Sequence, residues 1–242
     1  MTESLPPLEP LTEDWERALV VVAHPDDIEY GAAAAVARWT GQGKWVAYCL
    51  VTSGEAGMDA LPPAEAGPLR EQEQRRAAAI VGVDEVEFLG HPDGTIEYGL
   101  ALRRDIAWAI RRHRPDIVIT ANFRDSFGPG MLNQADHIAT GRAVLDAARD
   151  AGNRWVFPER ADPWNRVQAV WAAGSPEAGH GVDTTDTFDL GIASLQAHEA
   201  YLAGLEGHPD VAEFLAGWAR LAGDRLGCTY AASFEVYPIR LL

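Results

Sequence analysis

Apolar runs and segments with helical spacing alternate along this chain. The short apolar runs predict strands. They cover Leu19–Ala23, Trp45–Val51, Val86–Leu89, Ile117–Thr120 and Val167–Ala172, with an end strand near Phe234–Arg240. Segments with apolar residues at helical spacing predict helices. They cover Tyr30–Gln42, Leu69–Val81, Leu100–Arg112, Asp136–Ala151, Gly191–Leu205 and Val211–Leu221.

Strict alternation of strand and helix is typical of a parallel sheet with right-handed crossover connections. We therefore expect an α/β fold with a Rossmann-like, mostly parallel sheet flanked by helices, in a single domain that spans all 242 residues. A Gly-x-Gly-x-x-Gly fingerprint is absent after the first strand, which argues against dinucleotide binding. Residues 153–180, rich in Trp, Pro and Arg, predict a less regular C-terminal cap region. Its tryptophans either stack on a sugar or, as we favour, pack the core.

A polar cluster follows the first predicted strand. The run Val20–Ala23 leads directly into His24, Pro25, Asp26 and Asp27. Ligands of open α/β sheets bind at the carboxyl ends of strands, so we expect these side chains in one crevice. A histidine and a carboxylate can hold a divalent metal, and a second carboxylate can take a proton from water that the metal activates. The structural alternative is a turn and helix N-cap, for which Asp residues after Pro are also typical.

A second polar cluster lies far along the chain. Residues 133–137, Asn-Gln-Ala-Asp-His, separate a predicted strand and its loop from an Ala-rich helical segment. We expect both clusters at the same edge of the parallel sheet. Three ligands, His24, Asp27 and His137, would leave one coordination position open. That arrangement is typical of a catalytic zinc site rather than a structural one.

These motifs, in this order, resemble the PIG-L/LmbE family of zinc-dependent de-N-acetylases. That family includes N-acetylglucosaminyl-phosphatidylinositol deacetylases and the deacetylases of mycothiol and bacillithiol biosynthesis. The resemblance covers residues 18–148, and more loosely the chain to about residue 198. The matching motifs are Ala-His-Pro-Asp-Asp at 23–27, Thr-Ser-Gly-Glu-Ala-Gly at 52–57, Arg-Glu at 70–71, Phe-Leu-Gly-His-Pro-Asp-Gly at 88–94 and Asp-His at 136–137.

The resemblance implies a role for each residue of the two polar clusters. His24, Asp27 and His137 would be the metal ligands, and Asp26 would be the general base. This division is chemically sound, because the metal neutralises a ligand carboxylate and leaves its neighbour to transfer the proton. Asp136 would support the adjacent ligand histidine or handle a proton, and its structural alternative is a helix N-cap. Zinc is the expected cofactor, although such ligands also accept other divalent ions.

One position departs from the family pattern. The family usually carries His-Pro-Asp-His where this chain has Gln134 followed by Ala, Asp and His137. The family histidine is taken to stabilise the oxyanion and to help protonate the leaving amine. Gln134 can donate a hydrogen bond to an oxyanion, but it cannot donate a proton. The proton for the amine would then come from Asp26, after it has taken one from water, or from another residue.

The remaining motif residues allow two interpretations each. The turn at 52–57 is expected to be a loop that lines the pocket, because it lacks the lysine of a phosphate loop. Arg70, which opens a predicted helix, either binds a substrate hydroxyl or phosphate, as the resemblance implies, or is a solvated helix residue. Asp93 is either a sugar-hydroxyl acceptor or, as we favour, a turn residue. His198 is expected to form pocket wall only, and the loop at 54–68 is long enough for a lid.

Composition restricts the partners. The chain has 20 Lys and Arg against 36 Asp and Glu, a net charge of −16. This charge argues against nucleic-acid and anionic membrane partners. No segment reaches the roughly 18 consecutive apolar residues of a membrane span, and no signal peptide is recognisable. Cys49 and Cys228 give no disulfide framework, so we expect a cytoplasmic protein with a soluble small-molecule substrate. Composition leaves a homo-oligomer open.

The sequence therefore predicts a metal-dependent hydrolase that removes the acetyl group from an N-acetylated amino sugar or its glycoside. Two alternatives stay open. The first is an amidase that cleaves a larger acyl or thiol-conjugate amide with the same metal chemistry. The second is a metal-binding protein that no longer hydrolyses because Gln134 has replaced the acid. The intact Asp26 argues against the second, since a protein without hydrolysis has no need of a base.

Overall fold

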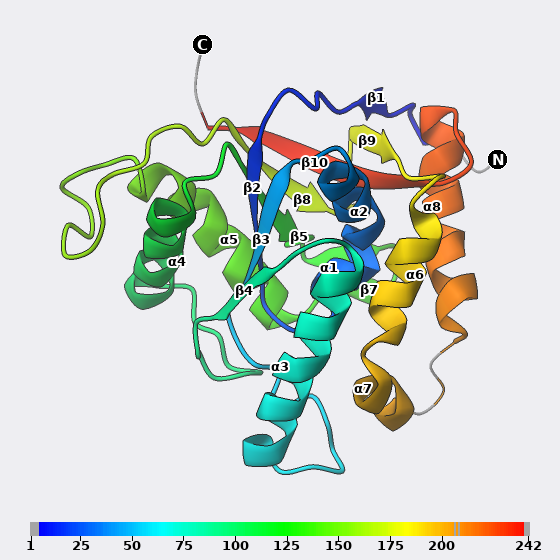
Figure 1. Cartoon of the computed structure of the whole chain (residues 1–242), viewed down its shortest axis with the longest axis horizontal. Helices are drawn as coiled ribbons and strands as arrows, with labels where there is room; N and C mark the ends of the chain where they lie inside the picture. Colours follow the sequence, from blue (N-terminus) through cyan, green and yellow to red (C-terminus); the bar gives the residue numbers. More distant parts are fainter. Residues whose placement is uncertain (1–4, 206, 208, 240–242) are drawn as a thin grey trace.

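The computed structural model describes residues 5–205, 207 and 209–239. Its centre is an eight-stranded sheet with the strand order β1-β9-β10-β8-β5-β2-β3-β4 (Figure 1). The strands of this sheet are β1 (Glu9–Pro10), β2 (Arg17–Val22), β3 (Trp45–Leu50), β4 (Glu85–Phe88), β5 (Ile117–Ala121), β8 (Ala169–Ala173), β9 (His180–Asp183) and β10 (Ala231–Pro238). A separate antiparallel pair consists of β6 (Ser126–Gly128) and β7 (Met131–Leu132).

Helices cover both faces of the sheet (Figure 1). On one face α4 and α5 pack together, and on the other lie α2, α3, α6 and α8. The helices are α1 (Asp27–Gly31), α2 (Ala33–Gly41), α3 (Pro63–Ile80), α4 (Leu100–His113), α5 (Ala135–Asp150), α6 (Phe188–Gln196), α7 (Glu199–Gly204) and α8 (Val211–Leu226).

The position of the central strand β2, which is covered on both faces, explains why its sequence is an unbroken apolar run. Ala18, Val20 and Val22 belong to the core beneath α2, whereas Leu19 and Val21 belong to the core beneath α4 and α5. Successive side chains of a strand point to opposite faces, so a strand covered on both sides needs apolar residues at every position. The predicted α/β fold with a mostly parallel sheet is confirmed.

Parallel pairing connects β4, β3, β2, β5 and β8 in that spatial order. Strand β10 runs antiparallel to both β8 and β9, so the sheet is mixed at this side. The first five predicted strands match β2, β3, β4, β5 and β8 to within about two residues, whereas β1 and β9 were not predicted. The predicted end strand corresponds to β10, although Arg240 lies outside the described residues.

Four helix predictions are wrong in detail, and the simplest difference is that α8 continues to Leu226 rather than ending at Leu221. Helix α3 begins at Pro63 rather than Leu69, because Pro suits a first helical position, where its missing N–H needs no partner. The second half of the supposed loop at 54–68 is therefore helix. The predicted helix Gly191–Leu205 is two helices, since His198 leaves helical geometry between α6 and α7. The segment Tyr30–Gln42 likewise begins within α1 and continues as α2.

The cap region is less regular, as expected, but it also supplies β8. Its tryptophans divide between core and surface. Trp171 is buried and packs edge-on to Trp15, with Trp39 beside it, whereas Trp155 is 83% exposed. The packing interpretation is correct for Trp171. None of the described helices combines the length and apolarity needed to cross a bilayer.

Candidate active site

The two polar clusters meet at the carboxyl edge of the sheet, where the order of strands reverses. From β2 the chain moves outward to β3 and β4, and it returns on the other side of β2 as β5. Loops leaving β2 and β5 therefore diverge at this edge, which is where ligands of open α/β sheets bind. The loop after β2 carries residues 24–27, and the segment after β5 leads through β6 and β7 to the start of α5 at Ala135.

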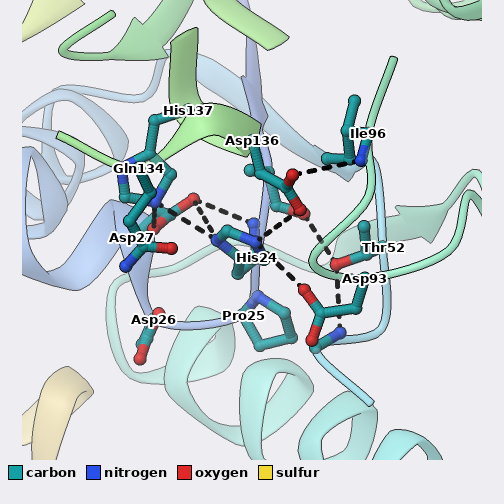
Figure 2. A network of polar contacts seen from close by, with 12 residues as sticks. His24, Pro25, Asp26, Asp27, Thr52, Asp93, Ile96, Gln134, Asp136 and His137 are labelled. Atoms are coloured by element: carbon teal, nitrogen blue, oxygen red, sulfur yellow. Dashed lines mark hydrogen bonds and ion pairs between the residues drawn. The ribbon is translucent and has the colours of Figure 1, made fainter. Parts of the chain in front are cut away.

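Side-chain atoms of His24, Asp27 and His137 converge at this edge of the sheet (Figure 2). Nε2 of His137 lies 3.0 Å from Oδ1 of Asp27 and 3.2 Å from Nδ1 of His24. Nδ1 of His24 lies 3.6 Å from Oδ2 of Asp27. These three groups are close enough to share one cation.

The partners of Nε2, the ring nitrogen that faces away from His137, determine the tautomer of His24. Nε2 lies 3.1 Å from Oδ1 of Asp93 and 3.3 Å from Oδ2 of Asp136. Carboxylates are acceptors, so Nε2 carries a proton and donates to them. In the neutral imidazole Nδ1 then presents a lone pair, and it points toward His137 and Asp27.

The tautomer of His137 is set by Asn133, a member of the second polar cluster to which sequence reasoning assigned no role. The Asn133 amide nitrogen donates to the carbonyl oxygens of Asn122 and Arg124, at 2.9 Å each. This orientation turns Oδ1 of Asn133 toward Nδ1 of His137, at 2.9 Å. Nδ1 of His137 therefore carries the proton, and Nε2 presents a lone pair. Asn133 stands one helical turn before His137, which is the signal in the sequence that could have identified it.

When both rings are neutral, two imidazole lone pairs and a carboxylate oxygen thus face one another. Two lone pairs at 3.2 Å repel each other unless a cation lies between them. Two histidine nitrogens and one carboxylate oxygen are typical ligands of divalent metals such as zinc. The other nitrogen of each ring donates its N–H to an acceptor, as is usual for histidines that bind a metal. The residues present therefore fit a divalent metal.

The pKa shifts within the cluster agree with a site for a positive charge. Burial alone would lower the pKa of His24, but the charge of Asp27 and hydrogen bonds to the surrounding carboxylates raise the pKa to about 12. Burial would likewise lower the pKa of His137, and Asp27 raises it above its usual value. Burial would raise the pKa of Asp27, yet the two imidazoles lower it far below its usual range. The cluster of His24, Asp27 and His137 attracts positive charge, which protons or a divalent cation can supply.

Asp93 and Asp136 also lie within metal-binding distance of His24, but their oxygens have other partners. Asp136 accepts from the backbone N–H of Gly94 at 2.8 Å and of Ile96 at 3.0 Å. Asp93 accepts from the N–H of Ala56 at 2.8 Å. Figure 2 shows both carboxylates on the Nε2 side of His24. We interpret them as supports of the imidazole, and a sugar contact for Asp93 stays a prediction.

Asp26 has the features of a general base. It precedes α1 with φ 90°, a conformation that residues with side chains rarely adopt. The residue is 5% exposed, and its Oδ2 accepts no hydrogen bond within the described part of the chain. Burial raises the pKa of Asp26 to about 6, although the charge of Arg70 opposes this. A buried carboxylate with a raised pKa is suited to take and return a proton.

Arg70 does not open a helix, because α3 begins at Pro63. Its guanidinium is nearly buried, with the residue 2% exposed. It donates to the carbonyl oxygen of Pro25 and lies 3.3 Å from Oδ2 of Asp26. Arg70 is therefore not a solvated helix residue. A substrate contact for it stays a prediction, and its contacts favour a structural role beneath the Asp26 loop.

Gln134 and His198 differ in their settings. Gln134 is the exposed N-cap residue of α5, within one helical turn of His137 (Figure 2). The predicted N-cap alternative for Asp136 is therefore wrong, because the helix begins earlier. His198 is fully buried and its Nε2 lies 3.6 Å from Oε2 of Glu29, and the pocket-wall interpretation of this residue stays a prediction.

Known proteins resemble this chain in sequence over most of its length. The family model PIG-L, described as GlcNAc-PI de-N-acetylase, matches residues 19–148. The chain is 34% identical to the probable N-acetyl-alpha-D-glucosaminyl L-malate deacetylase 2 of Bacillus anthracis over 76% of this chain and 81% of that protein. It is 28% identical to diacetylchitobiose deacetylase of Thermococcus kodakarensis over 77% of this chain and 70% of that protein.

A solved structure shows the same fold. The N,N'-diacetylchitobiose deacetylase from Pyrococcus horikoshii superposes with a TM-score of 0.82 at 23% identity, over 93% of this chain and 85% of that chain. The fold is that of an α/β protein in which His24, Asp27 and His137 could hold a metal ion. This chain belongs to the PIG-L family.

Proposed function

We propose that this protein is a zinc-dependent N-deacetylase that removes the acetyl group from an N-acetylated amino sugar or its glycoside. One observation carries the proposal: lone pairs of His24 and His137 and a carboxylate oxygen of Asp27 converge beside the buried, strained Asp26. The relatives support the substrate class, because both are named as deacetylases of acetylated sugar compounds.

The residues of the site divide the chemistry between them. A divalent ion held by His24, Asp27 and His137 would supply Lewis acidity toward water and the amide carbonyl. Asp26 takes the proton of the attacking water and then returns it to the leaving amine nitrogen. The amide of Gln134 donates a hydrogen bond to the developing oxyanion. No separate acid is required in this scheme, so the replacement of the usual family histidine is compatible with hydrolysis.

The charge of the chain bears on the substrate and its location. A net charge of −16 repels polyanions and anionic lipid surfaces, whereas a neutral acetylated sugar meets no such barrier. Cys49 and Cys228 are both free, as suits a reducing compartment. We therefore propose a soluble small-molecule substrate and a cytoplasmic location.

The experiment that tests the function is amine release from a panel of N-acetylglucosamine derivatives by zinc-loaded protein. Release is expected from at least one member, and His24→Ala should abolish it together with zinc binding. Asp26→Asn is the second variant, because Asn tolerates positive φ and preserves the shape of the side chain. It should keep zinc and lose turnover by roughly 100-fold or more. Native turnover in Asp26→Asn would refute the base assignment.

A negative panel would also be informative. If the zinc-loaded protein released no amine from any member, the deacetylase proposal would fail. A larger amide substrate would then be tested with the same variants, since the His24→Ala control depends on the metal and not on the acyl group.

A further inference from the structure

The guanidinium of Arg70 contacts the loop that carries Asp26, the proposed general base. Its Nη2 donates to the carbonyl oxygen of Pro25 at 2.7 Å and lies 3.3 Å from Oδ2 of Asp26. Its Nη1 donates to the carbonyl oxygen of Gly54 at 2.9 Å. One side chain of α3 therefore joins the loop after β2 to the turn after β3. Each contact is charge-assisted and removed from solvent, which makes it stronger than its exposed counterpart.

Glycines of the turn at 52–57 make room for this guanidinium. A Cβ atom at Gly54 would lie 2.2 Å from Nη1 of Arg70, and a Cβ at Gly57 would lie 2.5 Å from the same atom. Neither distance is possible without displacing the guanidinium. Gly54 also has a positive φ of 64°, but for Gly57 the obstacle is the close approach. The glycine pattern of this turn thus matches an internal cation rather than a bound phosphate.

The ring of Tyr201 also packs against the guanidinium of Arg70. The central carbon of the Arg70 guanidinium lies 4.1 Å from the centroid of this ring, a cation–π contact. Burial raises the pKa of the Tyr201 hydroxyl, and the nearby charge of the Asp26 carboxylate raises it further. Tyr201 therefore lies beside both the cation and the base that the cation pairs with.

One face of helix α3 contacts both the Asp26 loop and the helix that carries Tyr201. Arg70, Glu73 and Gln74 stand at positions i, i+3 and i+4 of α3, so their side chains share a face. Gln74 accepts a hydrogen bond from the backbone N–H of Asp26 at 2.9 Å. Glu73 accepts from the backbone N–H of Ala200 at 2.6 Å, at the start of the helix that carries Tyr201. The backbone of Asp26 and the helix of Tyr201 are thus both attached to α3.

We propose that Arg70 is a positioning residue for the general base, and that Gly54, Gly57 and Tyr201 form the cage that holds its guanidinium in place. The cage keeps Asp26 in its positive-φ conformation, with its carboxylate directed by Arg70 rather than free to rotate. A strained conformation of this kind persists only where its surroundings determine it. This inference rests on the proposed function, in which Asp26 transfers the proton.

The kinetic test uses variants that disturb the cage without touching the metal ligands. Tyr201→Leu removes the ring, and Gly57→Ala inserts a methyl group against the guanidinium. The matched control is Gly217→Ala, because a Cβ at Gly217 meets no atom within 4 Å. We expect kcat of the two cage variants to fall by roughly 10- to 100-fold, since misplacement of about 1 Å has such effects. KM and zinc content should stay native, and Tyr201→Phe should recover at least tenfold of the kcat lost in Tyr201→Leu.

A substrate-binding role for Arg70 gives the opposite result. Arg70→Lys would then raise KM with kcat nearly unchanged, and the cage variants would follow the same pattern, which overturns the proposal. Equal kcat in Tyr201→Phe and Tyr201→Leu would overturn the part assigned to the ring.

A second measurement is independent of turnover. The Nε–H resonance of Arg70 should be protected from exchange and shifted by the Tyr201 ring in the native protein, and it should lose both properties in Tyr201→Leu. If the Arg70 resonance is protected and ring-shifted but the protein releases no amine, the deacetylase proposal has failed and the cage proposal has not. An unprotected Arg70 signal in an active native protein would overturn the cage alone.

Discussion

Nε2 of His24 donates to Oδ2 of Asp136 at 3.3 Å, through the imidazole nitrogen that does not face His137. This relationship separates two possible roles of Asp136. A carboxylate on the outer nitrogen fixes the ring and raises the basicity of the inner nitrogen. It does not itself reach the atoms that would react.

Replacement of Asp136 by Asn should therefore weaken zinc binding rather than remove the proton transfer. In Asp136→Asn the amide nitrogen would stand either at Oδ1, facing the Ile96 N–H, or at Oδ2, facing the N–H groups of His24 and Gly94, so at least one donor would lose its acceptor, and the negative charge beside His24 is lost in both cases. We expect zinc affinity to fall by about 10- to 100-fold, measured by competition with a chromophoric chelator. Turnover should recover at saturating zinc. Turnover that stays low in the fully loaded variant would show that Asp136 handles a proton.

Asn133 should act on zinc affinity through the other imidazole. Removal of its side chain in Asn133→Ala leaves Nδ1 of His137 without the acceptor that fixes its tautomer. We expect zinc to bind about 10- to 100-fold more weakly in the same chelator competition. Gln134→Ala is the adjacent control, because the exposed side chain of Gln134 is not the acceptor that holds the His137 ring, and this variant should keep native zinc affinity. Equal losses in both variants would point to a general disturbance of the start of α5.

The sequence was sufficient to predict six of the eight strands of the sheet and the meeting of the two polar clusters, but not the short strands β1 and β9. A strand such as β2, buried on both faces, must be apolar throughout, and its abrupt polar end marks the sheet edge. The order reversal at β5 then brings His137 to His24 across 113 residues. Both inferences depend on local patterns and general rules of topology, which sequence preserves.

Contacts that depend on side-chain packing could not be predicted in this way. Arg70 looked like a solvated residue because Arg and Glu are common on exposed helix faces, and nothing in the local pattern shows that a loop and Tyr201 cover it. His198 continued a helical pattern, although its burial beside Glu29 coincides with a break in the helix. Long-range burial decides both cases, and one sequence carries no direct record of it.

Glu87 should make the stability of the protein sensitive to acid. Burial would raise its pKa, but hydrogen bonds from His113 and Arg112 lower it from its usual value near 4.5 to about 2. A lowered pKa in the folded state stabilises the fold above about pH 4.5, and this contribution is lost as the pH falls toward 2. With partial solvent screening it amounts to about 1–2 kcal/mol.

The measurement for Glu87 is urea unfolding of native protein and Glu87→Gln at pH 7, 4 and 3. The variant should be less stable at pH 7, and the difference in free energy of unfolding should shrink as the pH falls. The exposed Glu97 gives the matched control in Glu97→Gln, which should follow the native curve. A difference between native and Glu87→Gln that stays constant from pH 7 to pH 3 would contradict the assignment.

Gln134 provides the test of how this chain manages without the usual family histidine. If its amide donates to the oxyanion, Gln134→Ala should lower kcat by roughly 100-fold at saturating zinc, the typical cost of one such donor. Gln134→His restores a donor that can also release a proton, so kcat should exceed that of Gln134→Ala. The pH profile of kcat should also gain an ionisation near about 6.5 that the native profile lacks. Native kcat in Gln134→Ala would remove Gln134 from the mechanism. A His variant no faster than Gln134→Ala would show that the surroundings are fitted to an amide, and that Asp26 alone supplies the proton.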